Sequence, residues 1–139
     1  MGMKYILETA DVETIAAAAE DLALKREFKV TIAIVDDGGH LLYLKRLDGA
    51  SPMSVETSVA KAKTAALSRR DTGFYENLII NKQRMAFLNL EKFCFLEGAV
   101  PISIDQTVVG AIGVSGVASN DDLEIAQHAL HVFYQTSNE

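Results

Sequence analysis

Residues 30–46 read VTIAIVDDGGHLLYLKR, and this stretch decides the fold class. Its first six residues are rich in β-branched side chains, which favour a strand. The Asp36–Gly39 segment that follows tolerates the positive φ angles of a tight turn. Residues 40–46 then resume an apolar run of strand length. The stretch therefore predicts an antiparallel β-hairpin.

A second β-hairpin is predicted over residues 99–116. Its first strand carries Pro101 near its start, which is typical of a strand opening or an edge strand. The turn at Asp105 is a weaker signal than an Asp-Gly pair. Gly110 and Gly113 lie inside the long return strand, where they indicate a bend or the close approach of another backbone.

Three stretches show the three- and four-residue apolar spacing of amphipathic helices. The first begins at Thr9, which we interpret as its N-terminal cap. The second begins at Ser51, which is followed by a proline at the first helical position, and extends to about Leu67. The third begins at Ser119, and residues 135–139 are predicted to be a frayed tail.

Residues 71–96 are the part of the chain with the weakest pattern. They hold four of the six phenylalanines but no clear period, and short helical pieces are expected around residues 81–91. Two interpretations stay open. The aromatic side chains mark a contact with another subunit or a ligand, or they form a small satellite core.

The predicted order is helix, hairpin, helix, irregular segment, hairpin, helix. Hairpins make antiparallel sheet, and amphipathic helices need a sheet face to cover. The sequence therefore predicts an α+β fold with an antiparallel sheet. At 139 residues the chain suits a single domain over residues 1–139.

The composition narrows the range of partners. Nineteen acidic and 13 basic residues give a formal charge of −6, which disfavours nucleic acid as a partner. No apolar segment is long enough to cross a membrane and the start lacks a secretory pattern, so we expect no membrane contact and a cytoplasmic location. Cys94 is the single cysteine, which excludes an intrachain disulfide and a Cys-based zinc site. We interpret it as a buried, inert thiol between two phenylalanines.

Two groups of polar residues are candidates for chemistry. Arg46, Asp48, Lys61 and Lys63 lie at or near the exit of the first hairpin and on the following helix. If they converge, they suit a carboxylate or propionate ligand; the alternative is a structural Arg–Asp pair with solvated lysines. The residues of the second group lie on one face of the last helix. Their spacing suits a site for a divalent metal; the alternative is an exposed helix face that binds no metal. The group consists of Glu124, His128 and His131.

Five short motifs occur in the same order as in a known protein family. They are Val35–Leu41, Arg46–Ala50, Ala60–Ala66, Gly98–Ile102 and Val109–Gly116. With Asp122 and Ala126 on the last helix, the match covers about residues 8–134. By these motifs the chain resembles the GlcG/HbpS-like family of small haem-binding, haem-degrading proteins, which is related to the C-terminal domain of PduO-type cobalamin adenosyltransferases.

The resemblance carries expectations about fold and ligand. It implies a profilin-like α+β fold with a five-stranded antiparallel sheet covered by helices. It also implies a homo-oligomer that binds haem or a related tetrapyrrole, with Arg46 and Lys61 holding the propionates. The other ligand-binding positions implied by the motifs are Thr64, Gly110, Gly113, Ser115 and Gly116.

Two other classes of function stay open at this point. The charges near the first hairpin also suit an enzyme that acts on a small carboxylate in a catabolic pathway, as an isomerase, hydratase or lyase. In that case Arg46 would bind the carboxylate, and Asp48 or Asp122 would act as the acid or base. The third class is an assembly or accessory protein that acts through its surface. The sequence does not decide whether the chain is an enzyme.

Overall fold

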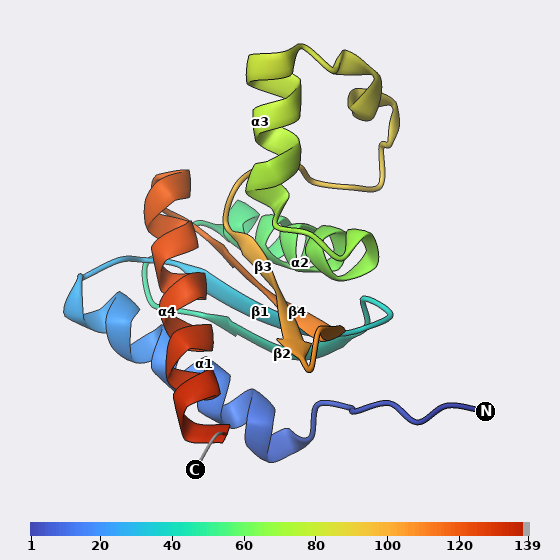
Figure 1. The fold of residues 1–139 in the computed structure, drawn as a ribbon. Coiled ribbons are helices and arrows are strands. Elements are labelled where there is room, and N and C mark those ends of the chain that lie inside the picture. Colours follow the sequence, from blue (N-terminus) through green and yellow to red (C-terminus); the bar gives the residue numbers. More distant parts are fainter. Residues whose placement is uncertain (138–139) are drawn as a thin grey trace.

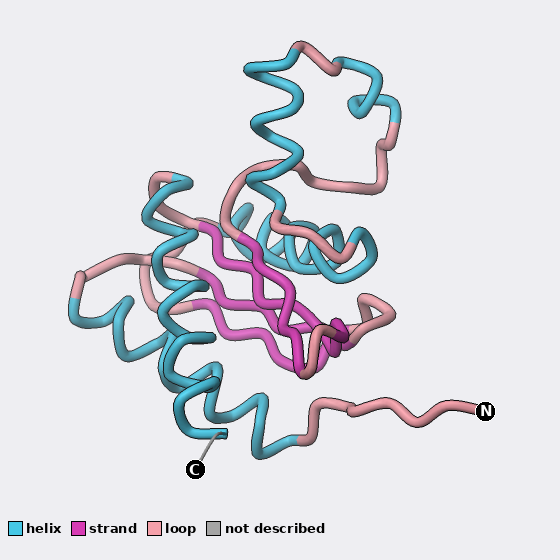
Figure 2. The backbone as a smooth tube through the Cα atoms, viewed as in Figure 1, coloured by secondary structure: helices cyan, strands magenta, loops and turns pink. Residues whose placement is uncertain are grey.

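The computed structural model describes residues 1–137 and has a layered α+β architecture (Figure 1). One sheet lies between two helices on one face and one helix on the other, and a further segment projects away from these layers (Figure 2). In chain order the elements are α1 (Thr9–Lys25), β1 (Thr31–Asp36), β2 (Leu41–Arg46), α2 (Pro52–Ser68), α3 (Thr72–Lys82), the 3₁₀ helix η1 (Met85–Asn89), β3 (Ala99–Ile104), β4 (Thr107–Ser115) and α4 (Ser119–Ser137).

The sheet confirms both predicted hairpins. All of its pairs are antiparallel and its strand order is β2-β1-β4-β3, so the two hairpins meet where β1 pairs with β4. The expectation of five strands is wrong for residues 1–137, because the sheet there has four. The sequence pattern contains only two hairpins, and the fifth strand came from the family resemblance alone.

The two faces of the sheet are packed differently. On the first face α1 and α4 cover a core of larger aliphatic side chains, among them Ile15, Ile32 and Ile112, all fully buried. On the other face α2 lies on a core built mostly of alanines. Gly113 of β4 is needed there, since a Cβ atom at this position would collide with the Ser58 carbonyl of α2. The predicted close backbone approach is therefore confirmed.

The helix ends follow the predictions with two corrections. Ser51 caps α2 as expected, since its side-chain oxygen accepts a hydrogen bond from the backbone N–H of Ser54. The cap of α1 is Glu8, not Thr9. The predicted frayed tail is also wrong in part, because α4 continues to Ser137; residues 138–139 lie outside the described part of the chain.

We call residues 72–96 the arm, because this segment projects from the layers beyond the end of α2 (Figure 1). The short helical piece expected around residues 81–91 is present as η1, whereas the 11-residue helix α3 before it was not predicted. Its apolar side chains are spread around the helix: Ile79 is buried, whereas Phe74 and Ile80 are exposed. A helix without a single apolar stripe carries no clear periodic signal. Among the described residues, no helix is long and apolar enough to cross a membrane.

Candidate functional site

Lys61 and Asp122 form an ion pair in the interior of the protein. The Lys61 Nζ atom lies 3.1 Å from Asp122 Oδ2 and also donates to the Val114 carbonyl oxygen at 3.0 Å. Both side chains are almost fully buried, with exposed fractions of 2% and 3%. Gly98 makes room for the pair, since a Cβ atom there would lie only 2.7 Å from Lys61 Nζ. The pair thereby ties α2 to β4 and α4.

Burial of the Lys61–Asp122 pair affects the pKa of the Asp122 carboxyl group. Burial raises the pKa of Asp122, and the nearby Lys61 charge and a hydrogen bond from the Val117 N–H act in the opposite direction. All the polar atoms of the pair that are buried have hydrogen-bond partners. A propionate or substrate at Lys61, or acid–base chemistry at Asp122, would require this pair to open.

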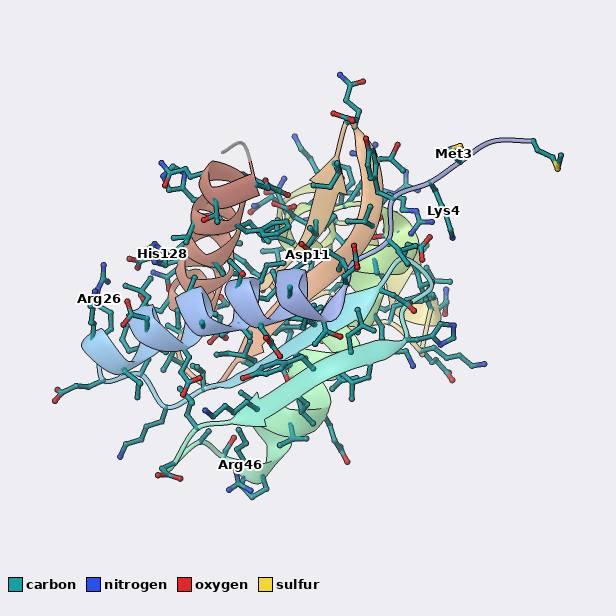
Figure 3. The ribbon with its side chains drawn as sticks, turned by 90° about the horizontal axis from the view of Figure 1, so that it is seen from below. Met3, Lys4, Asp11, Arg26, Arg46 and His128 are labelled. Atoms are coloured by element: carbon teal, nitrogen blue, oxygen red, sulfur yellow. The ribbon has the colours of Figure 1, made fainter. Side chains whose placement is uncertain are left out.

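Arg46 and Asp48 line a groove between the end of α1 and the end of β2, which we call the β2 groove. Arg46 lies at the end of β2 (Figure 3). The volume of the groove is about 420 Å³. Arg46 Nε donates to the Ala50 carbonyl at 2.9 Å, and Lys45 lies 2.6 Å from Glu20, whose carboxylate raises the pKa of Lys45. Lys61 does not line this groove, so the structure does not place the predicted cationic residues in one cavity.

The predicted residues in β4 and the glycine directly after it lie in close packing contacts. An added Cβ at Gly110 would collide with the Val35 carbonyl, and one at Gly116 would collide with the Lys29 carbonyl. Gly116 also has a φ angle of 145°, which favours glycine. Ser115 is buried opposite Thr31 in the β1–β4 pairing. These positions fix how the backbone packs at the middle of the sheet.

Thr64 connects α2 to the arm. Its hydroxyl donates to the Ala60 carbonyl and accepts a hydrogen bond from the Cys94 backbone N–H, both at 2.8 Å. It also lines a small apolar pocket of about 150 Å³, which we call the aromatic pocket. The residues around this pocket are Thr64, Leu67, Ser68, Tyr75, Phe87, Leu90, Phe93 and Phe95. The Tyr75 ring packs on Phe95 and Phe87 with centroids 5.1 and 5.4 Å apart.

A larger apolar groove lies in the arm itself, between α3 and the segment after η1. This arm groove has a volume of about 420 Å³ and was not predicted from the sequence, although the run of phenylalanines was its one signal. Its lining residues are Glu76, Ile79, Ile80, Leu88, Leu90, Glu91, Phe93, Cys94, Phe95 and Leu96. Cys94 is half-buried and lines the groove, so the expectation of a fully buried thiol is wrong.

The histidine face of α4 does not form a metal site. Within residues 1–137 there is no group of three His, Cys, Asp or Glu side chains arranged to hold a metal ion. Glu124 instead pairs with Arg26, which caps the C-terminal end of α1, with N–O distances of 2.6 and 3.2 Å. Arg26, at the end of α1, and His128 of α4 lie on the side of the sheet away from α2 (Figure 3).

Comparison with known proteins decides the family. The sequence model of the family described as "Haem degrading protein HbpS-like" matches residues 7–131. The chain belongs to the HbpS-like family. Protein GlcG of Escherichia coli K12 is 44% identical to it over 115 residues, which is 83% of this chain and 85% of GlcG. The family resemblance drawn from the five motifs is therefore confirmed.

Solved structures agree with the α+β fold. A double mutant of HbpS from Streptomyces reticuli superimposes with a TM-score of 0.86 at 28% identity, over 95% of this chain and 90% of that one. A PduOC:heme complex superimposes with a TM-score of 0.84 at 24% identity, over 92% and 95% of the two chains. The HbpS-like family thus has the layered fold seen here, with helices on both faces of an antiparallel sheet.

Proposed function

We propose that this protein binds haem or a related tetrapyrrole, and that the arm groove is the binding site. The observation that carries the proposal is the apolar groove with a half-buried cysteine in its wall, in a chain whose family is described as haem-degrading. An apolar groove with a volume of several hundred Å³ suits a flat hydrophobic ligand.

The residues of the arm groove fit a haem in three respects. Aliphatic and aromatic side chains such as Ile80, Leu88 and Phe93 would contact the faces of the macrocycle. Cys94 offers a sulfur, and a cysteine thiolate is one of the ordinary axial ligands of haem iron. Lys82 and Lys92 are exposed on the two segments that frame the groove, where they are suited to pair with the propionates.

Each group in this site has a defined role in the proposal. The Thr64 hydroxyl holds the backbone of Cys94 and so orients the donor sulfur from α2. The apolar walls would exclude water from a bound haem, a condition that tunes its redox potential. Bound haem would supply the redox chemistry of its iron, and the protein would supply the Cys94 sulfur, the apolar walls and the cations for the propionates.

Titration of the haem-free protein with hemin tests the proposal. We expect a Soret band that saturates at a fixed stoichiometry, and a shifted band with weaker binding in Cys94→Ala, because the sulfur ligand is lost. His40→Ala is the matched control, since it removes an exposed histidine at the β1–β2 turn, away from the arm, and should leave the titration unchanged. Absorbance that never saturates, or identical titrations of Cys94→Ala and the wild type, would contradict the proposal.

The β2 groove supports a second candidate function, the binding of a small carboxylate. Arg46 has its Nε atom fixed by the Ala50 carbonyl, and Asp48 is an exposed carboxylate in the same groove. An anion held by the guanidinium would therefore lie near an acid–base group. Calorimetric titration with simple hydroxy- and keto-carboxylates tests this function. Binding that is lost in Arg46→Gln supports it, and the absence of saturable heat contradicts it.

A further inference from the structure

The aromatic pocket is a separate cavity from the arm groove, and its lining has a different chemistry. None of its eight lining residues carries a charge. The arm groove, by contrast, is lined in part by Glu76 and Glu91, and the β2 groove is lined by six charged side chains. An ion that entered the aromatic pocket would lose its hydration without gaining a counter-charge there. The pocket therefore suits an uncharged molecule.

The size of the aromatic pocket limits its occupant to a molecule with one small ring. Its volume is about 150 Å³. An apolar protein cavity of about this volume accepts benzene. A tetrapyrrole has four linked rings and does not fit in the same space. The occupant of the aromatic pocket is therefore a different kind of molecule from the haem proposed for the arm groove.

The rings in the wall of the pocket favour an aromatic occupant over an aliphatic one. Tyr75, Phe87 and Phe95 contact one another, with ring centroids 5.1, 5.4 and 5.9 Å apart. The Phe87 and Phe95 rings meet edge to face, at 75°. Such tilted contacts are favourable because the edge of an aromatic ring is positive and its face is negative. A further aromatic ring in the pocket gains contacts of this kind, whereas a saturated ring does not.

Ser68 gives the pocket a hydroxyl group that is available for a hydrogen bond. In the part of the chain that the structure describes, this hydroxyl makes one long hydrogen bond, at 3.5 Å to the Arg70 carbonyl oxygen. The Thr64 hydroxyl already donates to the Ala60 carbonyl and accepts from the Cys94 N–H. A serine hydroxyl both donates and accepts, so Ser68 suits a hydroxyl group on the occupant.

We propose that the aromatic pocket is a binding site for a neutral phenol, with the ring of the phenol against the three contacting rings of the wall and its hydroxyl bonded to Ser68. A simple phenol is uncharged at neutral pH, because a phenolic hydroxyl titrates near pH ~10. The pocket is accessible in the folded protein, since Leu67 and Leu90 of its lining are 46% and 47% exposed. Binding removes the apolar surface of both partners from water.

A titration of the haem-free protein with phenol, followed by the amide signals in NMR spectra, tests the proposal. We expect saturable shifts in residues 64–68 and 75–95, with the signals around Arg46 in the β2 groove unchanged. Cyclohexanol should bind roughly fivefold more weakly, because it lacks the aromatic contacts. Benzoate should not bind, because it carries a charge. Shifts that do not saturate, or cyclohexanol or benzoate binding as tightly as phenol, would overturn the proposal.

A substitution that fills the pocket tests the location of the phenol. Leu67→Trp places a larger side chain in the lining and should weaken phenol binding at least tenfold. Leu41→Trp is the matched control, because Leu41 is similarly exposed, at 49%, and lies on β2 away from the pocket. Thermal melts establish that both variants are folded. Equal phenol binding by the two variants would place the phenol elsewhere and reject this site.

The hydrogen bond is tested by Ser68→Ala. This variant should raise the dissociation constant of phenol roughly fivefold and leave that of toluene, which has a similar ring but no hydroxyl, unchanged. An equal change for the two ligands, or no change for either, would contradict the proposed contact with Ser68. None of these measurements uses hemin, so their failure and the failure of the haem proposal are distinguishable.

Discussion

The layered body of the protein and its arm are built on different principles. The body buries aliphatic side chains on both faces of a sheet, and the buried polar atoms of the Lys61–Asp122 pair all have hydrogen-bond partners. The arm is held together by aromatic contacts among half-buried rings, and several of its large apolar side chains face solvent. The body therefore contains the core that stabilises the fold. The two apolar cavities, the arm groove and the aromatic pocket, lie at the arm.

The largest effect is expected from breaking the buried pair in the body. Asp122→Ala leaves the Lys61 ammonium buried without its counter-charge, so the free energy of unfolding should fall by about 3–5 kcal/mol. Urea denaturation measures this loss. Asp121→Ala changes the neighbouring, less buried carboxylate in the same helical turn and should cost much less. Equal effects of the two substitutions would mean that the pair does not stabilise the body.

The contact between α2 and the sheet should be the next most sensitive feature. Gly113→Ala adds a Cβ where the α2 backbone lies, and overpacking of this kind costs about 1–3 kcal/mol. The midpoint of thermal unfolding reports the effect. Gly2→Ala is the matched control, because nothing lies within 4 Å of an added Cβ at that position. A Gly113→Ala protein as stable as the control would show that α2 can shift freely on β4.

The arm should loosen without unfolding the body. Phe95→Ala removes the ring that contacts Tyr75, Phe87 and Phe93, so amide hydrogen exchange should accelerate over residues 72–96. The exchange of β1 and β4 should stay as in the wild type. Phe133→Ala, in the core of the body, should instead accelerate exchange throughout the sheet. If Phe95→Ala also destabilises the whole sheet, the arm and the body are one cooperative unit.

The smallest effect concerns the N-terminal segment. A hydrogen bond from Lys4 lowers the pKa of Asp37 below its usual value of 3.8. The folded state therefore gains stability from this contact above that usual value, and the gain is lost as the pH falls through the lowered pKa. For an exposed pair the gain is at most about 1 kcal/mol. Lys4→Ala should reduce stability at neutral pH and have no effect in strong acid; equal losses at both values would exclude the ion pair.

The sequence predicts the body well because its signals are local. The Asp-Gly turn, the β-branched runs and the Ser51 cap each act within a few residues, and all three appear in the structure. The interior pair was out of reach, because Lys61 and Asp122 are 61 residues apart and only the fold brings them together. The aromatic residues of the arm were singled out, but its two cavities were not predicted, because they arise between segments whose side chains show no periodic pattern. The family motifs pointed to Arg46 and Lys61, but these side chains lie in different surroundings.

The central claim is that the ligand site of this protein lies in the arm. Hydrogen exchange of the haem-free protein, compared with the same protein saturated with hemin, tests it most directly. We predict that slower exchange on saturation is concentrated in residues 72–96, with little change at the end of β2. Protection that appears instead around Arg46 and Asp48, with the arm unaffected, would contradict the claim and assign the ligand to the β2 groove.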